Sequence, residues 1–238
     1  MLMILALLVG AFFAALVSGA AGFGGALLLL PLLTRAVGIE QAVPMLTIAQ
    51  LVGNASRVGF GVRAVNWRLA GAFLLPAVPA AALGAFCFTG APADLTIRLV
   101  GAAILTFVLA RLTSVVRLKP SPPLLVMGGA VVGFLSGLVG SAGPLGAAIF
   151  LSMNLAPAAY VATEAVTAIG MHVTKAMIYQ HQLRLGPRFW PLALGMGAAM
   201  LAGTWVAKRI IDRLPRILFE AGVSVLLALA ALQMLFWP

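Results

Sequence analysis

The sequence Ser18-Gly19-Ala20-Ala21-Gly22-Phe23-Gly24-Gly25 occurs a second time, in altered form, 118 residues further along the chain. The second copy is Ser136-Gly137-Leu138-Val139-Gly140-Ser141-Ala142-Gly143, in which the serine and three of the glycines are identical. Twice 118 is 236, close to the full length of 238 residues. The chain is therefore predicted to be a tandem duplication, with one repeat over residues 1–118 and a second over residues 119–238.

Each glycine-rich stretch lies inside an apolar run that is too long for one membrane crossing. Residues 1–34 and residues 120–163 carry no charged side chain. A straight helix over the first run would be about 50 Å long, whereas the hydrocarbon core of a bilayer is about 30 Å thick. Clustered glycine is the expected helix breaker. A broken backbone inside a bilayer is tolerated where it lines a cavity, so two matching breaks predict a transporter with a midplane binding site.

The composition is that of a membrane protein. Hydrophobic residues make up 63% of the chain and charged residues 8%, with a mean hydropathy of +1.15. A soluble domain carries about 25% charged residues, so an all-α integral membrane fold is predicted. The net charge of +10 comes from basic residues scattered at segment ends, which favours membrane flanks over nucleic-acid binding. With one cysteine (Cys87), two histidines and five carboxylates, neither a metal centre nor another cofactor is expected.

Apolar segments separated by charged or proline-rich turns predict about eight transmembrane helices, four in each repeat. In the first repeat they are Leu2–Gly22, Gln41–Phe60, Leu69–Gly90 and Leu95–Leu112, and in the second Leu124–Gly140, Ala158–Tyr179, Phe189–Ala207 and Ile217–Trp237. A short arm follows each break, over Ala26–Thr34 and Leu145–Asn154, and hydropathy leaves open whether the arms cross the membrane. The basic link at residues 117–123 is expected on the cytoplasmic side of a multi-pass protein of the cytoplasmic membrane.

The arms, if helical, begin near Gly24 and Gly143. The free N–H groups and the positive dipole end of such helices form an anion site that needs no charged side chain. Pro144 suits a first helical turn but removes one donor, so the two half-sites are expected to differ. The alternative is that these small residues only allow helices to pack closely. The predicted anion-binding residues around the breaks are Gly22, Gly24, Gly25, Gly140, Ser141 and Gly143.

Two polar pairs occupy corresponding positions in the second segment of each repeat. Asn54 and Arg57 align with His172 and Lys175 at the offset of 118, and each pair shares one helix face. Basic residues inside a membrane usually face a cavity or a partner, so all four are candidate anion-binding residues, with two cations converging on a central anion. The alternative is that Arg57 and Lys175, which lie near segment ends, extend to the membrane surface.

Glu164 is the one acidic residue in the apolar part of the second repeat, and Leu46 stands at the corresponding position of the first. It precedes Lys175 by 11 residues, about 16 Å along a helix, so these two cannot form an ion pair. A buried Glu164 is a candidate to carry a coupling proton or to hold a cation. A position at the membrane surface is slightly preferred, because Glu164 lies near the start of its segment.

The stretch Gly22-Phe23-Gly24-Gly25-Ala26-Leu27-Leu28-Leu29-Leu30-Pro31-Leu32-Leu33 resembles the TauE/SafE family of sulfite exporters. That family shows Gly-x-Gly-Gly-Gly, several aliphatic residues and Pro-x-Leu in each half. The resemblance covers the whole chain, including the Ala42-Val43 and Val161-Ala162-Thr163 stretches. It implies transport of sulfite or a small organosulfur anion across the cytoplasmic membrane, commonly outward. The chain departs from the family pattern at Ala26, Ala142, Pro144, Ile149 and Glu164.

The leading hypothesis is a secondary carrier for a small anion, because the chain contains no Gly-x4-Gly-Lys-Ser/Thr nucleotide motif. The same residues are also compatible with an anion channel. An intramembrane enzyme is a weaker alternative, since its only acid–base pair would be Glu164 with His172. The expected partners are the anion and the lipid bilayer, without nucleic acid, and a homodimer is compatible with the sequence.

Overall fold

A computed structural model describes residues 2–87, 105, 121–140, 142–182 and 189–236 of the chain. Within these ranges the protein is built from helices, and no strand occurs. The prediction of an all-α fold is confirmed. The predicted segment Leu95–Leu112 and the link between the repeats lie mostly outside the described residues.

Every other predicted segment corresponds to one helix, and each predicted arm is a separate short helix. The elements are α1 (Leu2–Ala21), α2 (Gly25–Val37), α3 (Ile39–Gly61), the 3-10 helix η1 (Val62–Ala64), α4 (Trp67–Cys87), α6 (Pro122–Val139), α7 (Gly143–Leu151), α8 (Pro157–Gln182), α9 (Phe189–Ile211) and α10 (Arg216–Phe236). Among the described residues, α1, α4 and α9 are long and apolar enough to span a membrane, judged by length and composition. These three helices fit the predicted membrane fold.

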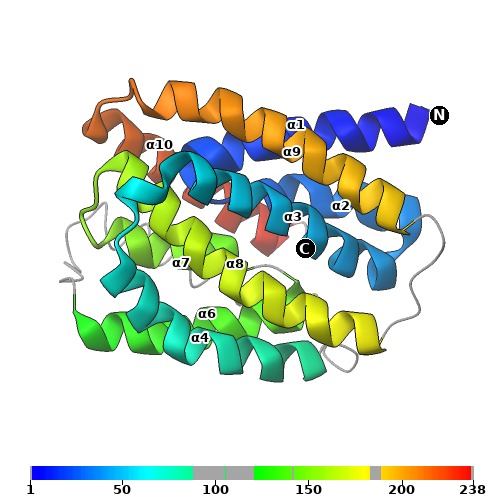
Figure 1. The fold of residues 1–238 in the computed structure, drawn as a ribbon, viewed down its shortest axis with the longest axis horizontal. Coiled ribbons are helices and arrows are strands. Elements are labelled where there is room, and N and C mark those ends of the chain that lie inside the picture. The colour runs from blue at the N-terminus through cyan, green and yellow to red at the C-terminus, as the bar shows by residue number, and fades with distance from the viewer. Residues whose placement is uncertain (1, 88–104, 106–120, 141, 183–188, 237–238) are drawn as a thin grey trace.

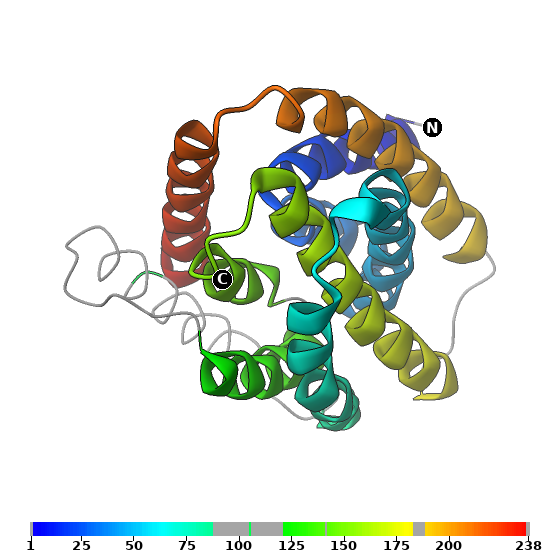
Figure 2. The ribbon, with the colours of Figure 1, turned by 60° about the vertical axis from the view of Figure 1, so that its left-hand side comes forward.

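Helices α3 and α8 lie in the middle of the bundle and run antiparallel (Figure 1). The end of α3 meets the beginning of α8, where Arg57 reaches Glu164. The beginning of α3 meets the end of α8, where Val43 and Tyr179 share one buried cluster. On one side of this pair α9 packs on α1, and on the other side α4 packs on α6. Helix α10 stands at the flank beside α7 (Figure 2).

Two apolar clusters surround the central pair. One joins α1, α2, α3 and α9 and includes Leu29, Met45 and Phe189. The other joins α4, α6, α7, α8 and α10 and includes Phe73 and Phe150. Most of the buried polar side chains described lie on α3 and α8. The fold therefore collects its polar residues on the two helices that lie between its apolar cores.

Glycines allow α6 to approach the backbone of α4. A Cβ atom added at Gly129, Gly133 or Gly137 would collide with a carbonyl oxygen of α4. The spacing of four residues puts these glycines on one face of α6, as small residues at close helix contacts require. In the same way, a Cβ atom at Gly19 would collide with Ala207 of α9. The close-packing interpretation therefore holds for Gly19 and Gly137.

The predicted helix breaks are confirmed at both glycine-rich stretches. Helix α1 ends at Ala21, and the next residues include Gly22 and Gly24, with φ angles of 85° and 101°. Helix α6 ends before Gly140, whose φ angle is 81°. These angles lie in the left-handed region, which glycine adopts at little cost. Glycine therefore has two roles in these stretches. Its left-handed backbone conformation ends the helices, and its lack of a side chain allows close packing.

Both arms fold back along the helix that precedes them. A Cβ atom at Gly25, the first residue of α2, would lie against Ser18, and one at Gly10 would lie against Leu32 near the end of α2. In the second half, a Cβ atom at Gly128 would meet Ile149 of α7. Each arm therefore runs antiparallel to its partner helix and returns toward the side from which that helix came. The arms are therefore not straight extensions of the helices that precede them.

Candidate functional site

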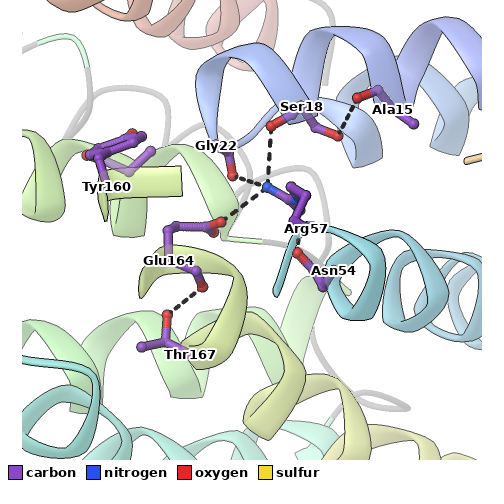
Figure 3. Close-up of polar contacts among 9 residues, drawn as sticks. Ala15, Ser18, Gly22, Asn54, Arg57, Tyr160, Glu164 and Thr167 are labelled. Carbon is purple, nitrogen blue, oxygen red and sulfur yellow. Dashed lines mark hydrogen bonds and ion pairs between the residues drawn. The ribbon is translucent and has the colours of Figure 1, made fainter. Parts of the chain in front are cut away.

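Arg57, near the end of α3, holds the C-terminal end of α1 (Figure 3). Its Nη1 donates to the carbonyl oxygen of Ser18 at 3.2 Å and to that of Gly22 at 2.8 Å. Carbonyl groups at the end of a helix need donors from elsewhere, and a bilayer interior supplies no water for this purpose. The Arg57 side chain is buried, so it is placed to serve as that donor.

Lys175 makes the same contacts in the second half. Its Nζ donates to the carbonyl oxygen of Ser136 at 3.3 Å, to that of Gly140 at 2.9 Å and to Ser136 Oγ at 2.9 Å. Lys175, Ser136 and Gly140 each lie 118 residues after the corresponding residue of the Arg57 contact. Each cation is therefore bonded to the end of the broken helix in its own half.

The alternative that Arg57 and Lys175 extend to the membrane surface does not fit their burial. Their exposed fractions are 8% and 0%. The aligned positions of α1 and α6 place carbonyl groups beside both cations, and this gives each buried charge hydrogen-bond partners.

Glu164 is buried, so the slight preference for a surface position is wrong. Its side chain accepts from Arg57 Nη1 at 3.2 Å, and its exposed fraction is 5%. The first turns of α8 lie beside the last turns of α3 because the two helices are antiparallel, and this brings Glu164 to Arg57 (Figure 3). The expectation that Glu164 does not pair with Lys175 fits this arrangement.

A central cavity of about 30 Å³ lies between the two broken helices. At about 10–15 Å³ for each water, it has room for two or three water molecules. Its walls come from both breaks, from the middle of α3 and α8, and from one residue of α9. The lining residues are Ser18, Gly22, Phe23, Gly24, Gly25, Ala26, Gln50, Asn54, Arg57, Ser136, Ala142, Gly143, Glu164, Ala168, Met171, His172 and Met200.

Most of the predicted site residues thus meet at one cavity. Two lie outside its lining: Lys175, and Gly140, whose carbonyl oxygen accepts from Lys175. Ser141 lies outside the described residues. The prediction missed Gln50, although its spacing of one helical turn before Asn54 was a usable signal. The predicted site residues that line the cavity are Gly22, Gly24, Gly25, Asn54, Arg57, Gly143, His172 and the coupling candidate Glu164.

Two buried nitrogen atoms of residues that line this cavity have no hydrogen-bond partner in the part of the chain that the structure describes. They are Asn54 Nδ2 and His172 Nδ1, on residues that are 1% and 5% exposed. The other end of the Asn54 amide is occupied, because Oδ1 accepts from Arg57 Nη2. An unsatisfied buried polar atom costs about 1–3 kcal/mol. The two residues occupy corresponding positions, 118 residues apart, at one cavity.

The two arms begin at the cavity without side-chain caps. Gly24 precedes α2 and Ala142 precedes α7, and neither helix start has a side-chain hydrogen bond. Gly25 and Gly143, the first residues of these helices, line the cavity. Helix starts favour negative charge through their N–H groups and dipole. Pro144 lies in the first turn of α7, as predicted, and leaves that start with one donor fewer.

Comparison with known proteins adds one match. The pattern of the family described as "Sulfite exporter TauE/SafE" matches residues 7–234. The chain belongs to this family. The TauE/SafE match covers nearly the whole chain, so the resemblance at the first glycine-rich stretch is confirmed. No match was found among curated proteins or among solved structures.

The TauE/SafE family is one of membrane transporters, and few charged groups lie at or near the cavity of this chain. Arg57 and Glu164 neutralise one another, and Lys175 adds a positive charge just outside the lining. No acidic partner of Lys175 is seen among the described residues. In the same part of the chain, no group of three His, Cys, Asp or Glu side chains is placed to hold a metal ion. The charged side chains that line the cavity are therefore one ion pair, and the nearest unpaired cation described is Lys175, which is bonded to Ser136 of the lining.

Proposed function

We propose that this protein is a secondary transporter of a small anion, sulfite or a small organosulfur anion, across the cytoplasmic membrane. The observation that carries the proposal is the pair of nitrogen atoms, Asn54 Nδ2 and His172 Nδ1, that lack a partner among the described residues at a cavity between two broken helices. The family supports transport, and the donors support an anion. Sulfite offers several acceptor oxygens, which fits donors that converge from both halves.

The anion is bound by neutral donors in this proposal, and the cations act behind them. Asn54 Nδ2 donates, and His172 donates through Nδ1 in the tautomer or charge state that carries a proton there. The N–H groups at the beginning of α2 and α7 complete the site. Arg57 and Lys175 position the ends of α1 and α6 and supply positive potential. A sulfite ion is larger than the waters it replaces, so its binding requires the cavity walls to move apart.

The two halves, residues 1–118 and 119–238, are proposed to form inverted repeats around this site. The contacts of Arg57 and Lys175 are alike at an offset of 118, and α3 and α8 run antiparallel. Inverted repeats with broken helices at the midplane are a recurring transporter design. Such a pair of halves can exchange conformations, so that the site opens to one side and then to the other.

Counterflow in proteoliposomes tests the transport proposal. Vesicles loaded with unlabelled sulfite are expected to take up labelled sulfite faster than empty vesicles, because a carrier exchanges its substrate across the membrane. An anion channel would instead give conductance without acceleration by internal sulfite. Uptake equal to that of protein-free vesicles for sulfite and for small sulfonates would contradict the proposal.

His172→Leu is expected to weaken anion binding without weakening the fold. The substitution removes a donor to a charged ligand, so affinity for sulfite should fall about 10- to 100-fold. It also removes an unsatisfied buried atom, so Tm without anion should stay equal or rise. Calorimetric titration and thermal unfolding measure the two effects. Thr174→Val, on the same helix but outside the cavity lining, is the control.

Anion binding is expected to strengthen as the pH falls. The Glu164 carboxylate competes with the anion for the positive field of Arg57, and protonation of Glu164 removes this competitor. Binding of a sulfonate, whose charge stays constant, should tighten as the pH is lowered and Glu164 takes up a proton, whereas Glu164→Gln should bind tightly at every pH. His172 and Lys175 are the other ionisable groups near the cavity, so His172→Leu and Lys175→Met, each in the Glu164→Gln background, assign any remaining pH dependence to one of them. A pH profile unchanged in Glu164→Gln would contradict this role.

A further inference from the structure

A second cavity, of about 20 Å³, lies at the end of the bundle next to Arg57. We call it the end cavity; the residues that matter here are Gly19, Arg57, Gly61, Val161, Thr204 and Lys208, which line it. Arg57 lines the central cavity as well. Its side chain, bonded to Gly22 and Glu164, therefore stands between the two spaces.

One of the residues that line the end cavity is a glycine and so has no side chain to fill it. Gly61 is the last residue of α3 and forms part of the wall. A Cβ atom added there would lie 3.2 Å from Ala162 Cβ, so a larger side chain would have to extend into the space. Lys208, another residue of the wall, forms an ion pair with Asp212 and is partly exposed. The wall of the end cavity thus includes a buried cation and one that reaches solvent.

The corresponding place at the other end of the bundle is filled. Tyr179 lies 118 residues after Gly61 and is 1% exposed. Its hydroxyl group donates to the carbonyl oxygen of Gly137 at 2.7 Å, and its ring shares a buried cluster with Val43. Gly137 and Val43 correspond to Gly19 and Val161 of the end cavity at the same offset. The tyrosine therefore occupies, beside Lys175, the space that Gly61 leaves open beside Arg57.

We propose that the end cavity is an access vestibule, through which the anion passes between the Arg57 end of the bundle and the central cavity. The proposal rests on the anion-transport function given above and adds the path that the anion takes. Arg57 forms the boundary between vestibule and central cavity, and it is positively charged on the path of an anion. Gly61 keeps the vestibule open, and Tyr179 closes the opposite end in this conformation.

Thiol labelling from either side of the membrane tests the vestibule without requiring transport. Cys87 is the only cysteine, so Cys87→Ser gives a cysteine-free background. Thr204→Cys then places a thiol in the vestibule wall. A small anionic, membrane-impermeant methanethiosulfonate reagent should label it from one face of oriented vesicles only. The control is Thr47→Cys, which is equally buried but lines neither cavity and should stay unlabelled.

Substituting Gly61 by tyrosine, and separately Tyr179 by glycine, tests the opposite roles of these two positions. Gly61→Tyr should reduce labelling of Thr204→Cys to the level of the cysteine-free protein. Tyr179→Gly should make Val43→Cys, at a buried position in the cluster of Tyr179, reactive from the other face, and Tyr179→Phe should not. Thr204→Cys that reacts from both faces or from neither, or Tyr179→Gly without effect, would overturn the proposal. Because labelling needs no sulfite, these outcomes are distinguishable from failure of the transport proposal, which counterflow measures.

Discussion

Arg57→Ala is expected to abolish anion binding and to lower the free energy of unfolding by about 3–5 kcal/mol, the usual cost of breaking a buried ion pair. The change leaves the Glu164 carboxylate buried without its partner and removes a donor from the carbonyl groups of Ser18 and Gly22. The end of α1 would then lose a contact that positions one wall of the cavity. Thermal unfolding in detergent and calorimetric titration with sulfite measure the two losses.

The matched controls for this result come from the chain itself. Lys175 makes the corresponding contacts with a lysine, so Arg57→Lys is expected to retain most of the stability and part of the affinity. Arg57→Ala combined with Glu164→Ala should recover stability relative to Arg57→Ala alone, because no unpaired charge remains. Stability and affinity that are both unchanged in Arg57→Ala would show that the ion pair holds neither the break nor the site.

Gly22→Val is expected to eliminate transport. Gly22 has a φ angle of 85°, and a Cβ atom there would lie 2.5 Å from Cε1 of the buried Tyr160 ring. A β-branched residue at such an angle is strained by at least about 1–2 kcal/mol, and the collision with Tyr160 adds to this cost. The chain can relieve both only by moving the Gly22 carbonyl, which accepts from Arg57. Counterflow and thermal unfolding check the expectation.

Gly71→Val separates this effect from the general cost of valine in a membrane helix. Gly71 lies in α4, has no left-handed φ angle, and a Cβ atom there would meet nothing within 4 Å. The Gly71→Val protein is expected to transport sulfite normally. If Gly22→Val also transported normally, the glycine break would have no part in the transport cycle.

The positions of the breaks were predictable because they depend on local sequence. Glycine clusters inside overlong apolar runs required an interruption, and the helices end and begin within a few residues of the expected positions. The same reasoning identified Asn54 and His172 as candidate anion-binding residues, because an offset of 118 aligns them. Both kinds of prediction use only spacing along the chain.

The partners of the charged residues were not predictable, because they depend on how distant helices run. Nothing in the sequence fixes the antiparallel approach of α3 and α8, which brings Glu164 to Arg57. The backbone carbonyl groups that accept from Lys175 carry no signal in residue identity. A position near a helix end suggested the membrane surface for Glu164, whereas a second helix covers that end.

The glycine contacts between α6 and α4 restrict how the protein can change shape. Carbonyl oxygens of α4 occupy the space where side chains would lie if Gly129, Gly133 and Gly137 of α6 were larger residues. A slide of one helix along the other by a single residue would drive these oxygens into neighbouring side chains. The two helices therefore move together as one rigid unit. Bending takes place in the glycine-rich connections at the ends of this unit.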